Sequence, residues 1–199
     1  MIFSLESERL DKGFYMEDAV SVAKNLLGKY LIKNTDKGFI GGMIVETEAY
    51  MGPQDDAAHS YNLRKTKRNE AMYEEGGVAY VYFIYGMHYC LNVVTNKRNI
   101  PQAVLIRAIE PKFGIDTMIK NRNTDLKNLT NGPAKLCRAL NIDLRCNKVS
   151  LLSDRLFITE GEEIKGDIIS TKRINIEYAE NYKDKPWRFV VKNSKFLSR

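Results

Sequence analysis

Two carboxylates and a tyrosine alternate along one apolar run, at a spacing that would let them act together. The run Val45–Tyr50 places Glu46, Glu48 and Tyr50 at every second position. That is the period of a β-strand, in which neighbours on one face lie about 7 Å apart. Two carboxylates on one face could be the catalytic pair of a glycosidase. They could equally form a solvated strand face, which is the usual state of glutamate.

Aromatic rings and a dense group of cations follow this run. Four basic residues fall within five positions, at Arg64, Lys65, Lys67 and Arg68. Rings lie on either side of them, at His59, Tyr80, Tyr82 and Tyr85. Rings and cations together are the components of a surface on which nucleic-acid bases stack. Packing inside a sheet is the simpler reading for Tyr80.

A β-hairpin is expected to carry the second set of rings. The segment Val78–Thr95 has two β-rich arms around a glycine, a pattern typical of a hairpin whose tip is Tyr85–His88. Alternate residues from Tyr80 to Ile84 then share one face of the first arm. Tyr85 lies at or near the tip, where a large ring has little protein to pack on.

The remaining elements predict an α+β fold in which residues 1–199 form a single mixed domain. We expect a mainly antiparallel curved sheet with flanking helices and the protruding β-hairpin. The long irregular segment Gly52–Gly77 is of a kind that is often functional. Helices are expected at Met16–Leu27, Lys112–Arg122 and Ala134–Leu140. The first has Glu17 and Asp18 in its first turn and Gly28 as its C-cap. The third follows Asn131-Gly132-Pro133, with proline in its first turn. Strands are expected at Tyr30–Ile32, Phe39–Tyr50, Ala103–Ile109, Leu156–Thr159, Ile168–Ile176 and Arg188–Val191.

The charge distribution permits a nucleic-acid partner. The net charge is +6, and many of the acidic residues collect at Glu160–Asp184, away from the basic runs. This separation indicates a basic face and a balanced back, although several solvated charge runs would give the same pattern. Lys135 is expected near the positive end of a helix, where an anion such as phosphate binds.

Cysteine and histidine usage argues against a metal site and a secreted protein. The three cysteines, Cys90, Cys137 and Cys146, form no CxxC pair, which favours a reduced intracellular chain. No apolar run reaches membrane-helix length and no signal-peptide core is present, so we expect no membrane association. Neither His59 nor His88 stands at a zinc-ligand spacing. We therefore expect no metal and no other cofactor, with Cys90 as a buried strand residue.

Six longer runs of the chain together resemble a known family. In order they are IVETEAYMGPQDDAAHS, KRNEAMY, VYFIYGMHYCLNVV, AVLIRAIEP, GPAKLC and PWRFVVK. They resemble the alkyladenine (3-methyladenine) DNA glycosylase family over roughly residues 23–198. The resemblance implies a monofunctional enzyme of base-excision repair. It would flip alkylated or deaminated purines, of the 3-methyladenine, hypoxanthine and ethenoadenine class, out of duplex DNA, because a stacked base is unreachable. Hydrolysis of the N-glycosidic bond would leave an abasic site.

The resemblance also assigns roles to residues around the cavity that would receive the base. Glu48 matches the acid/base that activates the attacking water, and Arg107 matches the arginine that helps to hold it. Tyr50 matches one wall of the base-binding slot, and His59 and Tyr82 match the other. Asn92 matches the residue that disfavours guanine by clashing with its exocyclic amine.

Further matches concern the DNA. Tyr85 matches the wedge that fills the vacated space in the duplex, and Met87, Arg68 and Lys135 match DNA contacts. The basic loop at residues 62–69 departs from the family at one position. Lys67 precedes Arg68 and Asn69, where family members more often have proline. Expected partners are double-stranded DNA containing damaged purines and no membrane, with a monomeric protein in the cytoplasm, at the nucleoid if bacterial or in the nucleus if eukaryotic. A non-catalytic nucleic-acid-binding module and a two-carboxylate sugar hydrolase are the alternative readings.

Overall fold

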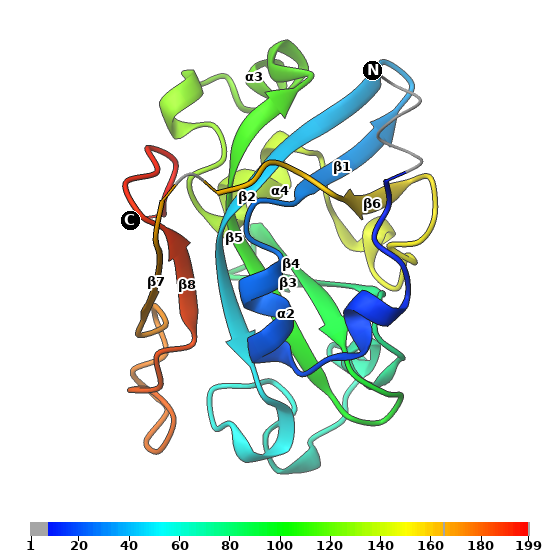
Figure 1. Cartoon of the computed structure of the whole chain (residues 1–199). Coiled ribbons are helices and arrows are strands. Elements are labelled where there is room, and N and C mark those ends of the chain that lie inside the picture. Colours follow the sequence, from blue (N-terminus) through cyan, green and yellow to red (C-terminus); the bar gives the residue numbers. More distant parts are fainter. Residues whose placement is uncertain (1–7, 165, 199) are drawn as a thin grey trace.

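Eight antiparallel strands form one sheet, and the computed structural model describes the chain at residues 8–164 and 166–198 (Figure 1). The strand order is β3-β4-β5-β2-β1-β6, and β8 pairs with both β2 and β7. The prediction of an α+β fold with a mainly antiparallel sheet is therefore confirmed. The strands are β1 Tyr30–Thr35, β2 Gly38–Tyr50, β3 Ala79–Ile84, β4 His88–Thr95, β5 Gln102–Phe113, β6 Leu156–Thr159, β7 Ile168–Thr171 and β8 Arg188–Val191.

Strand β2 is the centre of the sheet and has strands along both edges. One edge pairs with β5 over most of its length. The other edge pairs first with β1, at Gly38–Met43, and then with β8, at Glu46–Glu48. The register with β5 shifts on both sides of Glu46, an irregularity that bends a strand and increases its twist. The carboxylate-bearing part of β2 is thus enclosed between β5 and β8.

Three α-helices pack around the sheet: α2 Ala19–Asn25, α3 Ile115–Arg122 and α4 Pro133–Ala139. The Thr47 hydroxyl donates to the Ala23 carbonyl over 2.8 Å and so ties α2 to one face of β2. Because side chains alternate along a strand, Glu46 and Glu48 point to the opposite face. The two carboxylates therefore lie on the side of the sheet away from α2.

Helix α2 is shorter than the predicted helix Met16–Leu27. A 3-10 turn at Gly13–Met16 precedes it. Asp18 lies before the first turn rather than inside it, because its carboxylate caps the helix and accepts the N–H groups of Val20 and Ser21. A side-chain oxygen at this position satisfies amides that the helix itself leaves unpaired.

The predicted helix Lys112–Arg122 starts too early. Strand β5 continues to Phe113, and α3 begins only at Ile115. Gly114 separates the two with a φ of +60°, and a Cβ atom there would lie 2.6 Å from a side-chain carbon of Ile40. Only glycine fits this turn, so strand and helix meet at it.

The predicted strand Ile168–Ile176 is wrong in its second half. Strand β7 ends at Thr171. Beyond it the side chain of Arg173 turns inward to a buried ion pair with Asp55, and Asn175 has a φ of +59°. An extended strand cannot both turn Arg173 inward to Asp55 and adopt a positive φ at Asn175, so residues 172–176 form a loop.

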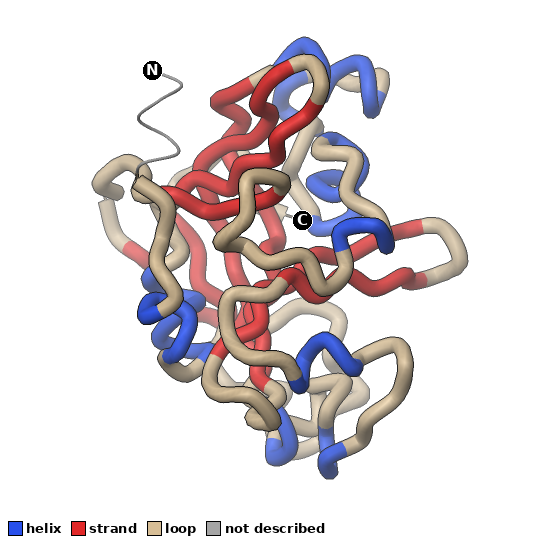
Figure 2. Tube along the Cα trace, turned by 90° about the vertical axis from the view of Figure 1, so that its right-hand side faces the viewer, coloured by secondary structure: helices blue, strands red, loops and turns tan. Residues whose placement is uncertain are grey.

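The hairpin β3–β4 projects beyond the rest of the molecule (Figure 2). Tyr85 and Gly86 both have positive φ values, 54° and 68°, and the N–H of Met87 bonds to the carbonyl of Ile84 across them. Tyr85 and Met87 expose 76% and 69% of their surface. The expected position of Tyr85 at the tip is confirmed.

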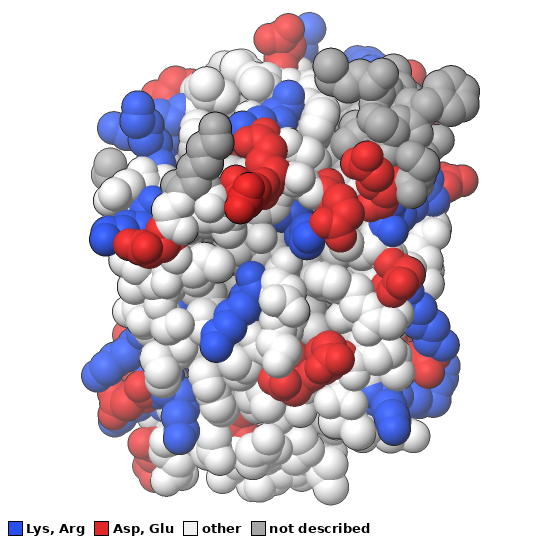
Figure 3. All heavy atoms as spheres, viewed as in Figure 1, with Lys and Arg blue, Asp and Glu red and all other residues white. Residues whose placement is uncertain are grey.

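The face of the molecule that carries α2 mixes Lys and Arg side chains with Asp and Glu side chains (Figure 3). This mixture is what the charge pattern predicts for a balanced back. Within the described part of the chain, no helix is long and apolar enough to cross a membrane.

Candidate active site

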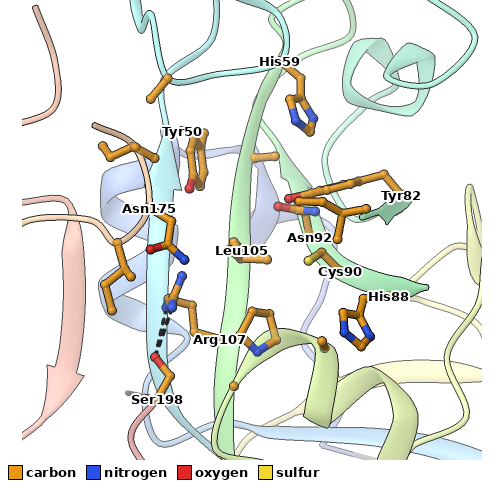
Figure 4. A pocket seen from close by; sticks show the side chains of 18 of the residues that line it. Tyr50, His59, Tyr82, His88, Cys90, Asn92, Leu105, Arg107, Asn175 and Ser198 are labelled. Carbon is orange, nitrogen blue, oxygen red and sulfur yellow. Dashed lines mark hydrogen bonds between the residues drawn. The ribbon is translucent and has the colours of Figure 1, made fainter. Parts of the chain in front are cut away.

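A cavity of about 370 Å³ opens between the hairpin, the start of α4 and the loop after β7 (Figure 4). Its volume lies within the roughly 300–1,000 Å³ of small-molecule sites. Seven of the site residues expected from the sequence line it: Tyr50, His59, Tyr82, Tyr85, Asn92, Arg107 and Lys135. His88 also borders it. Residues from distant parts of the sequence are thus brought to one hollow.

Tyr50 forms one wall and is fixed from behind. Its hydroxyl donates to Glu48 over 3.0 Å. The Arg173 guanidinium carbon lies 4.8 Å from the ring centroid, within cation–π range. Arg173 itself is held by two bonds to Asp55, of 2.6 and 2.9 Å. Burial, followed by the charge of Glu48, raises the pKa of Tyr50, so the phenol keeps its proton.

His59 and Tyr82 form the opposite wall. The two rings meet edge to face with centroids 4.6 Å apart, and Figure 4 shows both across the cavity from Tyr50. Nδ1 of His59 lies 2.8 Å from the Tyr80 hydroxyl. Tyr80 is buried, as its packing interpretation requires. Burial lowers the pKa of His59 to about 4, so the imidazole is neutral at neutral pH. The two walls thus enclose a slot lined by aromatic rings.

Glu48 is fully buried and does not itself line the cavity. Its Oε2 accepts the Tyr50 hydroxyl and the Nη1 of Arg107, the latter over 3.2 Å. Its Oε1 accepts the backbone N–H of Ile174 over 2.7 Å. Because Tyr50 and Arg107 both border the cavity, the carboxylate lies directly behind its lining.

Glu46 is also fully buried, so the interpretation of the two glutamates as a solvated strand face is wrong. Its Oε1 accepts the Nε of Arg107 over 3.0 Å and the Nε of Arg188 over 2.7 Å. Burial alone would lower the pKa of Arg107, but the charges of Glu48 and Glu46 reverse this and raise it. Two carboxylates and two guanidinium groups therefore balance in charge beneath the cavity.

Asn92 and Cys90 form part of the cavity floor. Asn92 is 4% exposed and donates from Nδ2 to the Tyr80 carbonyl over 3.1 Å, which fixes its amide. Cys90 is buried, as expected, and burial raises the pKa of its thiol. The thiol therefore stays protonated at neutral pH.

The residues expected to contact DNA lie around the rim. Arg68 donates to the Phe83 carbonyl over 3.2 Å, and its guanidinium carbon is 5.2 Å from the Tyr82 ring centroid. Arg68 therefore links the basic loop at residues 62–69 to the β3–β4 hairpin. Lys135, in the first turn of α4, donates to the side chain of Asn131 over 2.9 Å. Proline opens α4, as the sequence predicts.

Three positions at the cavity were not predicted from the sequence: Ile174, Asn175 and Ser198. Asn175 and Ser198 line the cavity next to Arg107 (Figure 4), and the backbone of Ile174 contacts Glu48. No local pattern marks them, because each reaches the site through tertiary contacts of a loop. Among residues 8–164 and 166–198, no group of three or more His, Cys, Asp or Glu side chains could hold a metal ion.

Comparison with known proteins identifies the family to which this chain belongs. The family model described as methylpurine-DNA glycosylase (MPG) matches residues 13–195. A protein of Clostridium novyi (strain NT) is 47% identical over 201 residues, covering 96% of this chain and 99% of its own. One from Borreliella burgdorferi (strain ZS7) is 50% identical over 192 residues, covering 96% of this chain and all of its own. Each is named "Putative 3-methyladenine DNA glycosylase".

These matches define the class of the protein as a DNA glycosylase, a hydrolase of base-excision repair that acts on DNA. The chain belongs to the methylpurine-DNA glycosylase family. The resemblance found in the sequence is thereby confirmed, and a non-catalytic nucleic-acid-binding module is no longer a competing reading.

Proposed function

We propose that the enzyme flips alkylated or deaminated purines out of duplex DNA into the cavity and hydrolyses their N-glycosidic bond. The class includes 3-methyladenine, hypoxanthine and ethenoadenine. The observation that carries this proposal is the buried Glu48, bonded to Tyr50 and Arg107 directly behind an aromatic slot. The base would stack between Tyr50 on one side and His59 and Tyr82 on the other.

Glu48 is the proposed general base. A carboxylate has about four acceptor positions, and protein groups of the described chain occupy three on Glu48. We assign the remaining position, on Oε1, to the attacking water, which Arg107 would also contact from the cavity lining. Proton abstraction by a positioned base contributes about 10²–10⁴-fold in rate. A purine methylated at a ring nitrogen is cationic and leaves readily, so one carboxylate suffices for such a lesion.

Selectivity follows from the two walls and the floor. Electron-rich rings attract a cationic base by about 1–2 kcal/mol more than a neutral one when the contact is desolvated. Asn92 cannot rotate away without breaking its bond to Tyr80, so we assign to it the exclusion of guanine. Tyr85 is the proposed wedge, because a ring exposed at a hairpin tip is available to enter the base stack. Met87, Arg68 and Lys135 are the proposed contacts to the DNA strands.

The two-carboxylate sugar hydrolase is less well supported. In such enzymes both carboxyl groups flank the scissile bond. Glu46 does not border the cavity, and two arginines already bond to it. The single-domain organisation of residues 1–199 and the monomeric state stay predictions.

Glu48→Gln tests the mechanism, because glutamine keeps the shape of the side chain and removes its basicity. Release of free base from a duplex containing ethenoadenine is measured under single-turnover conditions, together with the affinity for that duplex. We expect the rate to fall at least 100-fold and the affinity to change little. Glu110→Gln, a carboxylate on β5 that does not border the cavity, is the matched control and should retain the wild-type rate. An active Glu48→Gln enzyme would refute the proposed mechanism.

A further inference from the structure

The segment that follows β8 returns to the buried carboxylates through Ser198. The backbone N–H of Ser198 donates to Oε2 of Glu46 over 2.6 Å, and its hydroxyl donates to Oε1 over 2.7 Å. Phe196 and Leu197, just before it, pack against the main hydrophobic core. The position of Ser198 is therefore fixed by apolar packing as well as by two hydrogen bonds to one carboxylate.

Glu46 accepts four hydrogen bonds from protein groups of the described residues. Its Oε1 takes the Ser198 hydroxyl and the Nε atoms of Arg107 and Arg188, and its Oε2 takes the Ser198 amide. A carboxylate has about four such positions. A buried charge is tolerated only when it is paired and hydrogen-bonded in this way. Glu46 thus holds Arg107, Arg188 and Ser198 in place.

The hydroxyl of Ser198 also contacts Arg107. Its oxygen accepts the Nε of Arg107 over 3.3 Å and the Nη2 over 3.1 Å, the contact drawn in Figure 4. A serine hydroxyl has one donor and two acceptor sites. Since its proton goes to Glu46, both acceptor sites are turned to the guanidinium. Ser198 therefore bridges Glu46 and Arg107.

This bridge sets the direction in which Arg107 presents its charge. Guanidinium is a planar fork with five N–H donors. Glu46 and Ser198 occupy the Nε side and part of Nη2, and Glu48 takes one donor of Nη1. One N–H on each Nη atom is not engaged by any protein group among residues 8–164 and 166–198. Because Arg107 borders the cavity, these two donors are the ones available to a water molecule or a substrate oxygen there.

We infer that Ser198 and Glu46 are positioning residues for excision: through hydrogen bonds they lock the plane of Arg107 so that its Nη edge serves Glu48 and the cavity. The inference rests on the roles proposed above for Glu48 and Arg107. Without the hydroxyl, Arg107 loses two of its acceptor contacts and Glu46 loses a donor. The guanidinium can then tilt, and a misplacement of about 1 Å at a reacting centre can cost about 100-fold in rate.

The test uses the full chain and an ethenoadenine duplex, and it compares four side chains at position 198. Single-turnover excision rate, duplex affinity and melting temperature are measured for the wild type, Ser198→Thr, Ser198→Cys and Ser198→Ala. Hydrogen-bonding capacity is equal for Ser and Thr, lower for Cys, whose thiol is a weak donor and acceptor, and absent in Ala. We expect the rates to follow it, with Thr within about 5-fold of the wild type and Ala reduced about 10–100-fold. Duplex affinity should stay within about 3-fold throughout, because the lesion is bound by the rings and the rim.

Ser194→Ala is the matched control, since Ser194 lies in the same segment and its hydroxyl accepts only the Phe196 amide among the described residues. It should retain the wild-type rate. The positioning role would be overturned if the excision rates did not follow the hydrogen-bonding capacity of the side chain at position 198. It would also be overturned if the rate of the Ser194→Ala control fell as much as that of Ser198→Ala. Glu48→Gln, measured alongside, distinguishes a failure of this inference from a failure of the proposed function. If it is inactive while Ser198→Ala is normal, only this inference fails; if it is active, the proposed function fails first.

Discussion

Tyr85→Asn should move the stability of the free protein and its affinity for damaged DNA in opposite directions. Tyr85 has a φ of 54°, in the left-handed region, which costs an L-residue roughly 1–2 kcal/mol. Asparagine adopts this region readily, because its short polar side chain bonds locally. The tyrosine ring is 76% exposed, so its removal forfeits little packing. We therefore expect the free energy of unfolding to rise by about 1 kcal/mol, or roughly 2–4 °C in melting temperature.

Binding to a damaged duplex should weaken at the same time. Extruding a nucleotide costs a few kcal/mol, and a wedge offsets part of that cost. If the ring contributes about 2 kcal/mol, its loss reduces affinity about 30-fold. Chemical denaturation measures the first quantity, and fluorescence anisotropy with an ethenoadenine duplex measures the second.

Tyr85→Phe is the matched control, because it keeps both the ring and the strained backbone. Its stability and duplex affinity should equal those of the wild type. A less stable Tyr85→Asn protein would refute the strain argument, and undiminished affinity would refute the wedge.

Three further predictions concern pH, a buried ion pair and lesion choice. Because burial lowers the pKa of His59 to about 4 from 6.5, the unfolded chain takes up this proton more readily between those values. The free energy of unfolding should therefore fall as pH decreases from about 6.5 to 4, and His59→Gln should flatten that part of the profile; an identical slope contradicts the assignment. Asp55→Ala leaves the charge of Arg173 buried and unpaired and should cost about 3–5 kcal/mol in denaturation experiments. The exposed Lys172, paired with Asp184, is its control and should cost under about 1 kcal/mol on replacement by alanine. Asn92→Ser should admit more guanine lesions in a panel of damaged duplexes; an unchanged ranking of lesions would count against its role at the cavity floor.

Local periodicity was enough to predict the part of the site that comes from strands. Glu48 and Tyr50 share a face because a strand alternates, and the glycine between two apolar arms located Tyr85 at a hairpin tip. These features depend only on neighbours in sequence. The ranges of β6 and β8 were also predicted correctly, since short apolar runs bounded by polar residues leave little choice of boundary.

The rest of the site depends on contacts between residues far apart in the chain. Arg173 and Asp55 are 118 positions apart, and Ser198 and Glu46 are 152 apart. Nothing in the neighbourhood of Glu46 indicates that two guanidinium groups cover it, so its burial could not be predicted. The loop after β7 was mistaken for strand for the same reason, because its course is set by the distant partner of Arg173.

The enclosure of β2 between other strands has a consequence for divergence within the family. A one-residue insertion there would turn every following side chain to the opposite face and destroy the acid and the aromatic wall together. The loops at residues 52–77 and 172–187 can change in length outside the parts that hold His59 and the Asp55–Arg173 ion pair, because surface loops tolerate changes of length. Relatives with a different lesion range should therefore differ from this enzyme in the lengths of those two loops, while the central strand keeps its length.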